Sequence, residues 1–296
     1  MNPLIKDIQS QKQSLDEFID VTKRVLIYLP SIISGRKETR GYTLLSSEAA
    51  GTKKFVRPIC NNLFIFNPDK FQTQTKKYLS ILDKLQGRKK TFSTKEFYIV
   101  DSVTYTIQQS VGVALDLLSN PNSARKHVGN RFEELIRLVI SKAGISNKKV
   151  VFKIPYPTEE GEKMYSCETD MIISPFKTVK SNVKNIDKRE IVLSLKNSSK
   201  DRMGKIFLDK LLMERFAGHP VKVVGIFLND VQRKEEEGIS YTFVSGLFMV
   251  YTKFLCVLEG VYFLDPPPKT KEAPYNKHVL PFSKFLLEYL PEFSAP

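Results

Sequence analysis

The sequence predicts an α/β fold in which a central mixed β-sheet is flanked by helices and preceded by a helical region. From about residue 124, helical and strand-like segments follow in the order helix, strand, strand, strand, helix, strand. This order is typical of a sheet with helices packed on it. We therefore expect a helical N-terminal region at 1–120, an α/β core at 121–264, and a proline-rich extension with one short helix at 265–296.

The N-terminal region contains two clear helical patterns separated by a polar segment. Residues 14–33 have helical periodicity, with Ser14 placed to cap the first turn and Glu17 three residues on. Residues 34–54 are rich in glycine, serine and basic side chains, and they predict a loop. Residues 96–119 predict a long, mostly buried helix that the sequence Asn-Pro-Asn-Ser ends.

The core begins with an amphipathic helix, GNRFEELIRLVISKAG, which Gly144 closes. A largely buried element of undetermined type is expected at 242–260. The other predicted core elements are strands at 150–154, 169–174, 190–196 and 221–229, and a helix at 202–217.

The charge of the chain indicates the kind of partner. Lysine and arginine number 46 against 32 aspartate and glutamate residues, so the formal net charge is +14. The basic residues are spread along the whole chain, which favours a polyanionic partner, nucleic acid first and an acidic membrane surface second. The alternative is a merely basic protein. The predicted loop at 34–54 is then either an arm that faces DNA or a solvated linker.

Several classes of protein receive little support. No apolar run reaches the roughly 18–20 residues that span a bilayer, and the N-terminus has no signal-peptide pattern. The cysteines at 60, 167 and 256 are far apart and form no Cys-x-x-Cys pair. We expect a reduced cytoplasmic protein with no membrane partner and no structural zinc. The three histidines are equally scattered, which argues against histidine-based catalysis.

Two strand-like segments carry a carboxylate and a lysine at positions where the two side chains could meet. Asp170 stands at the start of an apolar strand, where a carboxylate is costly unless it is paired or bound to a metal. Glu168 lies two residues earlier on the same face and remains a rival. Lys196 ends the next strand, 26 residues after Asp170. Adjacent strands would place Asp170 and Lys196 side by side, whereas the alternative is that both only mark where strands leave the core.

Helical periodicity separates two neighbouring glutamates in GNRFEELIRLVI. Glu133 shares its stripe with Ile136 and Ile140, so it is expected to point toward the core. Glu134 shares its stripe with Arg137 and is expected to point toward water in an ordinary surface pair with that arginine. A glutamate that faces the core needs a metal or another partner, which makes Glu133 the candidate site residue.

A cluster of charge follows the strand that Lys196 ends. Lys200, Asp201 and Arg202 stand at the start of the predicted helix, and Asp209 lies seven residues after Arg202 on the same helical face. The two cations can donate to guanine in the major groove, and Asp201 can accept from cytosine. The alternative is a surface helix in which Lys205 pairs with Asp209.

Together these residues resemble the PD-(D/E)xK restriction endonucleases, in the branch that includes EcoRII, PspGI, SsoII and NgoMIV. That branch lacks the acidic residue two positions before the lysine, and this position is Ser194 here. In the family a carboxylate on the following helix replaces it. Asp209 stands 13 residues after Lys196, where the relatives usually carry glutamate. The family's strand aspartate corresponds to Asp170, preceded here by Thr169 instead of the usual proline.

Two further motifs carry the resemblance, which covers about residues 129–215. The string KNSSKDR places Lys200, Asp201 and Arg202 in the base-reading positions of the family. The string GNRFE places Glu133 in the position of the family's helix glutamate.

The resemblance implies a Mg²⁺-dependent type II restriction endonuclease whose PD-(D/E)xK catalytic core is the segment 121–264. Asp170 and Asp209 are then expected to hold Mg²⁺, with Glu133 assisting directly or through water. Lys196 is expected to orient and help deprotonate the attacking water, or to stabilise the charge of the phosphorane. The implied products carry a 5′-phosphate and a 3′-hydroxyl.

The resemblance also implies the partners. The substrate is double-stranded DNA with a short, near-palindromic site of the CCGG, CCNGG or CCWGG type, and the lysine-first triplet favours CCWGG. A two-fold symmetric target calls for a homodimer or a tetramer. A cognate DNA methyltransferase is the expected functional partner. The N-terminal region is expected to contact DNA, to mediate dimerisation, or to do both.

Two other functions remain open from the sequence. One is a less specific nuclease of DNA repair or recombination. The other is a non-catalytic DNA- or RNA-binding protein that acts through its basic surface.

Overall fold

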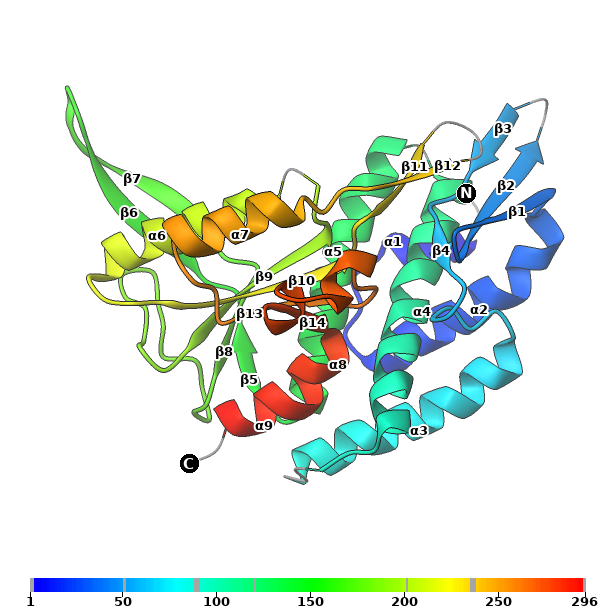
Figure 1. Ribbon diagram of the computed structural model, residues 1–296, viewed down its shortest axis with the longest axis horizontal. Coiled ribbons are helices and arrows are strands. Elements are labelled where there is room, and N and C mark those ends of the chain that lie inside the picture. The colour runs from blue at the N-terminus through cyan, green and yellow to red at the C-terminus, as the bar shows by residue number, and fades with distance from the viewer. Residues whose placement is uncertain are drawn as a thin grey trace.

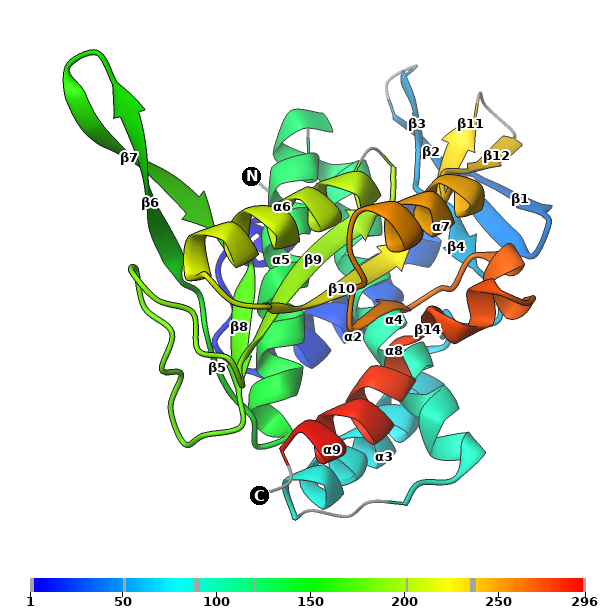
Figure 2. The same cartoon turned by 60° about the vertical axis from the view of Figure 1, so that its left-hand side comes forward.

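A six-stranded mixed sheet forms the centre of the molecule, with helices on both faces (Figures 1 and 2). The computed structural model describes residues 3–49, 52–87, 91–119, 121–200, 202–234 and 238–294. The predicted fold class is confirmed. In spatial order the strands are β14 (Val279–Pro281), β13 (Gly260–Phe263), β10 (Lys222–Asn229), β9 (Ile191–Ser198), β8 (Met171–Ser174) and β5 (Ser146–Lys148).

The direction of the strands changes at β9. Strand β9 runs parallel to β10, and β10, β13 and β14 are parallel to one another. On its other side β9 pairs antiparallel with β8, so that Met171 lies opposite Leu193. β8 in turn pairs antiparallel with β5. The register between β8 and β9 places the residue before β8 next to the second half of β9.

Alternating side chains of the sheet enter two hydrophobic cores. Leu193 and Leu195 of β9 belong to one core, while Val192 belongs to the other. This period of two is the ordinary consequence of the pleated strand. Two long helices, α4 (Thr94–Leu118) and α5 (Pro121–Lys142), contribute to the first core. The second core includes residues of α6 (Met203–Ala217) and α7 (Ser245–Phe254). Helix α7 occupies the middle of the segment 242–260, whose type the sequence left undetermined.

The N-terminal region combines helices with a small sheet, and its helix ends follow local signals. Ser14 caps α2 and accepts a hydrogen bond from the backbone N–H of Glu17. Gly144 follows α5 with a φ of +85°, a conformation that glycine adopts without strain. The helices of this region other than α4 are α1 (Pro3–Gln9), α2 (Leu15–Ile32) and α3 (Pro68–Gln86).

The segment 34–54 is not a loop, contrary to the prediction. It holds most of an antiparallel sheet in which β2 pairs with β1, β3 and β4. Arg40 and Gly41 make the two-residue turn of the first hairpin with φ values of +48° and +81°, as hairpins of this length require. The composition of this segment is that of a loop, although residues 42–46 of β2 are all buried. The four strands are β1 (Gly35–Thr39), β2 (Tyr42–Ala49), β3 (Thr52–Phe55) and β4 (Ile59–Cys60).

Two hairpins and the C-terminal segment complete the fold. The hairpin of β6 and β7 projects from the body, and the hairpin of β11 and β12 lies beside the N-terminal sheet (Figures 1 and 2). The C-terminal segment is helical as expected near residues 283–290, and its side chains Phe282, Phe285 and Leu290 are buried in the first core. The remaining elements are β6 (Val151–Thr158) with β7 (Gly161–Glu168), β11 (Val231–Lys234) with β12 (Gly238–Tyr241), the 3-10 turns Pro268–Lys271 and Tyr275–Lys277, α8 (Phe282–Lys284), a π-helical turn at Phe285–Tyr289, and α9 (Leu290–Phe293).

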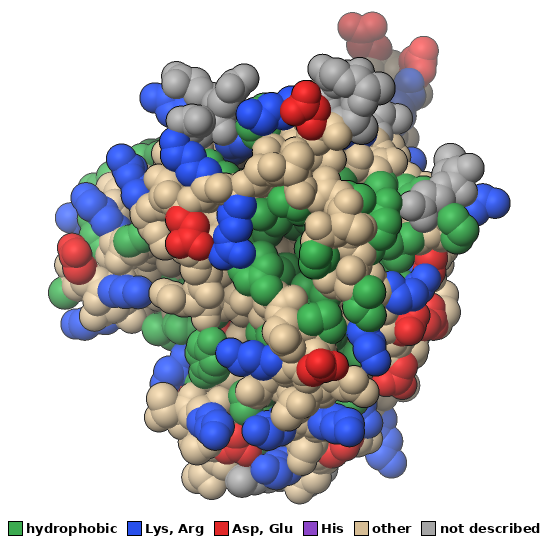
Figure 3. Space-filling model, turned by 90° about the vertical axis from the view of Figure 1, so that its right-hand side faces the viewer, with side chains coloured by type: hydrophobic (Ala, Val, Ile, Leu, Met, Phe, Trp, Pro, Cys, Tyr) green, Lys and Arg blue, Asp and Glu red, His purple; other side chains and the backbone are tan. Residues whose placement is uncertain are grey.

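On the face drawn in Figure 3, basic side chains are not gathered in one patch. Figure 3 shows them scattered among polar and apolar groups on the side of β1–β3 and α2. None of the helices in the described ranges is both long enough and apolar enough to cross a membrane.

A buried carboxyl group joins the C-terminal segment to the long helix α4. Asp101 Oδ1 accepts from the backbone N–H of Ser283 at 2.8 Å, and Asp101 Oδ2 lies 2.6 Å from the Ser283 hydroxyl. Burial raises the pKa of Asp101 to about 7, although the two bonds to Ser283 oppose this shift. Near neutral pH the folded protein therefore holds a proton that the unfolded chain has released.

This proton makes stability depend on pH, and we expect Asp101→Asn to reduce the dependence. Because the folded-state pKa lies above the ordinary 3.8, the free energy of unfolding falls as pH rises from about 4 to about 7. Asparagine resembles the protonated acid, so the variant should lose roughly 2 kcal/mol less than the wild type between pH 5 and pH 8. Urea unfolding at both pH values measures this, and equal losses in both proteins would contradict it.

Candidate active site

A lysine and an aspartate meet across the antiparallel strands β8 and β9. Asp170 directly precedes β8, and the Lys196 ammonium of β9 donates to Asp170 Oδ2. The backbone N–H of Leu195 donates to the same oxygen at 2.7 Å. The Lys196 and Asp170 side chains are only 17% and 18% exposed. The prediction that neighbouring strands bring these two residues together is confirmed.

Glu133 of α5 lies close enough to this pair to respond to its charges. Burial and the negative charge of Asp170 raise the pKa of Glu133, while Lys149 and Lys196 act in the opposite direction. Lys149 Nζ lies 3.9 Å from Glu133 Oε2. Glu133 and Asp170 are thus two carboxylates that repel each other, and Lys149 and Lys196 offset only part of the rise in the pKa of Glu133.

The rival carboxylate Glu168 occupies a different position. It ends β7, is 67% exposed, and lies 3.6 Å from Lys149 Nζ. Asp170 is the carboxylate that contacts Lys196. Both carboxylates border the same pocket, but only Asp170 is held by the strand backbone.

A pocket of about 320 Å³ lies between the end of β7, strand β9 and helix α6. We call it the carboxylate pocket, and its charged lining residues are Glu168, Asp170, Lys196, Lys205 and Asp209. Both carboxylate oxygens of Asp209 accept from Lys205 Nζ at 2.7 Å. The pair that the sequence offered as an alternative therefore forms, and Asp209 also lines the same pocket as Asp170. Glu133 is outside this lining.

The donor chemistry of the site fits Mg²⁺. Carboxylate oxygens are the ligands that this hard cation prefers, and it is commonly held by one or two carboxylates together with water and substrate phosphate. In the described part of the chain, no three His, Cys, Asp or Glu side chains converge closely enough to hold a metal by themselves. Burial first, and then repulsion by Asp170, raises the pKa of Glu133. A cation that shares its coordination with DNA would relieve this repulsion.

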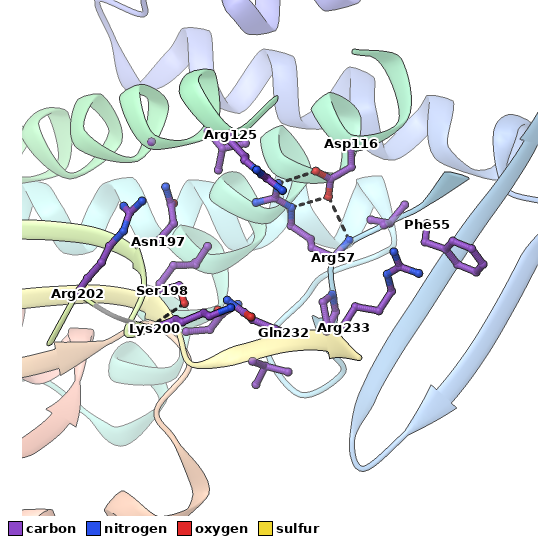
Figure 4. Close-up of a pocket in the computed structure, with 17 residues that line it drawn as sticks. Phe55, Arg57, Asp116, Arg125, Asn197, Ser198, Lys200, Arg202, Gln232 and Arg233 are labelled. Carbon is purple, nitrogen blue, oxygen red and sulfur yellow. Dashed lines mark hydrogen bonds and ion pairs between the residues drawn. The ribbon is translucent and has the colours of Figure 1, made fainter. Parts of the chain in front are cut away.

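A larger pocket of about 810 Å³ lies at the end of β9. We call it the basic pocket, because five cationic residues line it and Asp116 is its single carboxylate in the described ranges (Figure 4). Lys200 and Arg202, two of the predicted base-reading residues, are among the five and are exposed. The third, Asp201, lies outside the described residues. The five cations are Arg57, Arg125, Lys200, Arg202 and Arg233.

Strand β9 separates the two pockets. Lys196 lines the carboxylate pocket, and the next residue, Asn197, lines the basic pocket. Asn197 Oδ1 accepts from Gln108 Nε2 of α4 at 3.1 Å. Because successive side chains of a strand point to opposite faces, one strand supplies residues to both pockets.

The predicted orientation of Glu134 is wrong. Its side chain is 14% exposed, less than the 33% of Glu133. It pairs with Arg131 at 2.5 Å and accepts from the backbone N–H of Lys12 at 2.9 Å, in place of the expected pair with Arg137. The chain that precedes α2 packs onto this face of α5, which the periodicity of α5 alone does not reveal.

The expectation that Arg202 and Asp209 share one helical face is also wrong. Helix α6 begins at Met203, and Arg202 is the residue that precedes it. Arg202 faces the basic pocket, whereas Asp209 faces the carboxylate pocket. The two residues therefore belong to different parts of the site.

Some residues of the site carried no signal in the sequence. Lys149 lies in the short connection between β5 and β6, and Arg57 and Asp116 belong to segments 59 residues apart. The charge of Lys149 acts on Glu133 only because the fold brings β5 beside α5. A search for lysines beside predicted strands would have found Lys149 among many others.

The mixed central sheet flanked by helices matches the fold of a solved type II restriction endonuclease. The structure matches the crystal structure of the Type IIP restriction endonuclease Kpn2I with a TM-score of 0.74, covering 99% of this chain and 98% of that chain at 16% identity. At this identity the likeness shows the fold, and it extends through the N-terminal region.

Other comparisons contribute less. The restriction endonuclease PspGI in complex with its substrate DNA matches with a TM-score of 0.40 and 12% identity over 76% of this chain and 92% of that chain. No protein-family model matches the sequence, and no curated protein matches it significantly.

The charge balance around Glu133 leads to a direct prediction for Lys149→Gln. Lys149 lowers the pKa of Glu133, so its neutralisation should raise that pKa further, because the charged carboxylate loses a favourable neighbour. Carboxyl ¹³C NMR titration measures the shift. Lys153→Gln, in the adjoining strand β6, is the matched control, because Lys153 donates to Ser166 and its neutralisation is expected to leave Glu133 unchanged. An unchanged titration of Glu133 in Lys149→Gln would contradict the assignment.

Proposed function

We propose that the chain is a type II restriction endonuclease that cleaves double-stranded DNA with Mg²⁺ at a short, near-palindromic C/G-containing site. The candidate targets are of the CCWGG, CCNGG or CCGG type. The observation that carries the proposal is the Asp170–Lys196 pair with Asp209 in the same pocket. The shared fold with the Type IIP restriction endonuclease Kpn2I supports it.

The carboxylates are assigned to the metal. Asp170 and Asp209 would hold Mg²⁺, and Glu133 would assist directly or through water. When bound, Mg²⁺ supplies neutralisation of charge at the phosphate and a more acidic water. For Asp209 this role requires exchange of its contact with Lys205, which is a pair on a helix surface. Such pairs contribute little free energy, so the exchange is inexpensive.

Lys196 is assigned to the attacking water or to the phosphate. Its ammonium has three N–H donors, and Asp170 fixes the position of the group. Held in this way, Lys196 can orient the water and help to deprotonate it, or donate to an oxygen whose negative charge grows in the transition state. The expected products carry a 5′-phosphate and a 3′-hydroxyl.

The residues at the end of β9 are assigned to recognition of the bases. Lys200 and Arg202 can donate to guanine O6 and N7, and Asp201 can accept from cytosine N4. Lys200 lies only four residues after Lys196. Recognition and cleavage would therefore be positioned by one continuous stretch of chain.

The symmetry of the target determines the assembly and the cellular context. A near-palindromic site requires two copies of each reading element, so the active species would be a homodimer or a tetramer. A restriction enzyme also requires protection of the host DNA, which would come from a cognate DNA methyltransferase.

A plasmid digest tests the proposal. Purified protein with supercoiled and linear plasmid in Mg²⁺ should give discrete fragments, because a specific nuclease cuts at fixed positions. Sequencing of the fragment ends then gives the site. A smear would indicate a less specific nuclease, and DNA that remains intact in Mg²⁺ at several salt concentrations would contradict the proposal.

Lys196→Ala tests the assignment of the site. The variant should lower the cleavage rate by about 100-fold or more while binding of duplex DNA in EDTA remains within about twofold. Lys222→Ala is the matched control, because Lys222 is an exposed lysine at the start of the neighbouring strand β10. Normal cleavage by Lys196→Ala would show that the catalytic centre lies elsewhere.

A further inference from the structure

We propose that the basic pocket binds the same DNA duplex as Lys200 and Arg202, through Arg125, Gln232 and Arg233 on its other walls. This inference rests on the proposed function and extends the recognition surface to α5 and β11. Phe55 and Arg57 of the N-terminal region would line the same DNA-binding cleft.

The charge of the pocket is the first support. Its one described carboxylate, Asp116, is fully engaged by Arg57 through Nε at 2.8 Å and Nη2 at 2.7 Å. Four further cationic residues belong to its described lining, namely Arg125, Lys200, Arg202 and Arg233. A hollow with this balance favours a polyanion over a neutral or cationic ligand.

The arrangement of the cations is the second support. Figure 4 shows Arg202 on one side of the hollow, Arg233 on the opposite side, Arg125 along a third side and Gln232 between the strands below. Arg125 belongs to the first turns of α5, and Gln232 and Arg233 belong to β11. Donors that converge from three separate elements can hold a backbone from several directions.

Arg233 is positioned by an aromatic ring. Its guanidinium carbon lies 4.4 Å from the centre of the Phe55 ring, which belongs to β3. Stacking on an aromatic face orients an arginine side chain. This contact also joins the β11–β12 hairpin to the N-terminal sheet, as the ribbon views show (Figures 1 and 2).

The floor of the pocket is rigid. The backbone N–H of Arg57 donates to Asp116 Oδ2 at 3.1 Å, in addition to the two guanidinium bonds. A Cβ atom on Gly112 would lie 2.5 Å from the Arg57 guanidinium. Glycine at this position therefore allows Arg57 to lie flat against α4. The β3–β4 connection is thereby fixed to the helix, so the wall that carries Phe55 is preorganised.

The position of the pocket relative to the carboxylate pocket completes the argument. The two share strand β9, with Lys196 on one side and Asn197 on the other. A duplex placed with a phosphate near Lys196 and base edges near Lys200 would continue over the basic pocket. In this position Arg125 and Arg233 would contact phosphates, and the amide of Gln232 would face a base edge.

The test measures binding of a short fluorescein-labelled duplex of mixed sequence by anisotropy, in EDTA, over a range of salt concentrations. The full chain carrying Arg125→Gln and Arg233→Gln should lose about tenfold or more in affinity at low salt, and the slope of log K against log salt should fall by about two. Arg189→Gln is the matched control, since Arg189 stacks on Phe176 in the same manner outside the pocket. It should change the slope by less than about one half.

The outcomes separate the two proposals. If the wild type cuts plasmid and the double variant keeps its affinity and slope, the pocket proposal is wrong and the nuclease proposal stands. If the wild type binds DNA without cutting it and the double variant loses affinity, the pocket proposal stands and the nuclease proposal is wrong. If the wild type binds no duplex, both are wrong. Arg125→Gln alone, at an exposed helix position, provides a second variant with half the expected effect should the double variant fold poorly.

Discussion

The pairing register between β8 and β9 is the constraint on which the candidate site depends. With Met171 opposite Leu193, Asp170 lies next to the second half of β9 and accepts from both Leu195 and Lys196. A shift of one residue would turn every side chain of β9 to the other face. It would bury Lys196 in the apolar core that Leu195 now occupies. The hydrophobic pattern of the strand therefore fixes the position of the charged pair.

The same alternation explains why one strand can serve two pockets. Lys196 faces a small hollow lined by carboxylates, and Asn197 faces a large hollow lined by arginine and lysine. The sheet therefore separates the pocket that contains carboxylates from the pocket that contains mostly cationic side chains. The cations of the basic pocket are thereby kept from neutralising Asp170.

The parts of the site that the sequence predicted are those governed by local rules. A carboxylate at the mouth of one apolar strand and a lysine at the end of the next follow from period-two patterning, as does the cap of α2 by Ser14. The hairpin within 34–54 escaped prediction because its composition is that of a loop. The partners of Glu134, and the charge of Lys149 beside Glu133, depend on tertiary contacts between distant segments. The metal and base-reading roles of the residues stay predictions.

Two buried acids show how the N-terminal sheet comes to form part of the site. Asp230 follows β10 and Asp265 follows β13, so both lie at the carboxyl ends of neighbouring parallel strands. The Tyr42 hydroxyl of β2 donates to Asp265 Oδ2 at 2.9 Å, and burial raises the pKa of both aspartates. Acids buried so deeply are costly when charged and acceptable when protonated or hydrogen-bonded. The N-terminal sheet is therefore packed against the carboxyl ends of the core strands. In this position its residues 55–58 form one wall of the basic pocket.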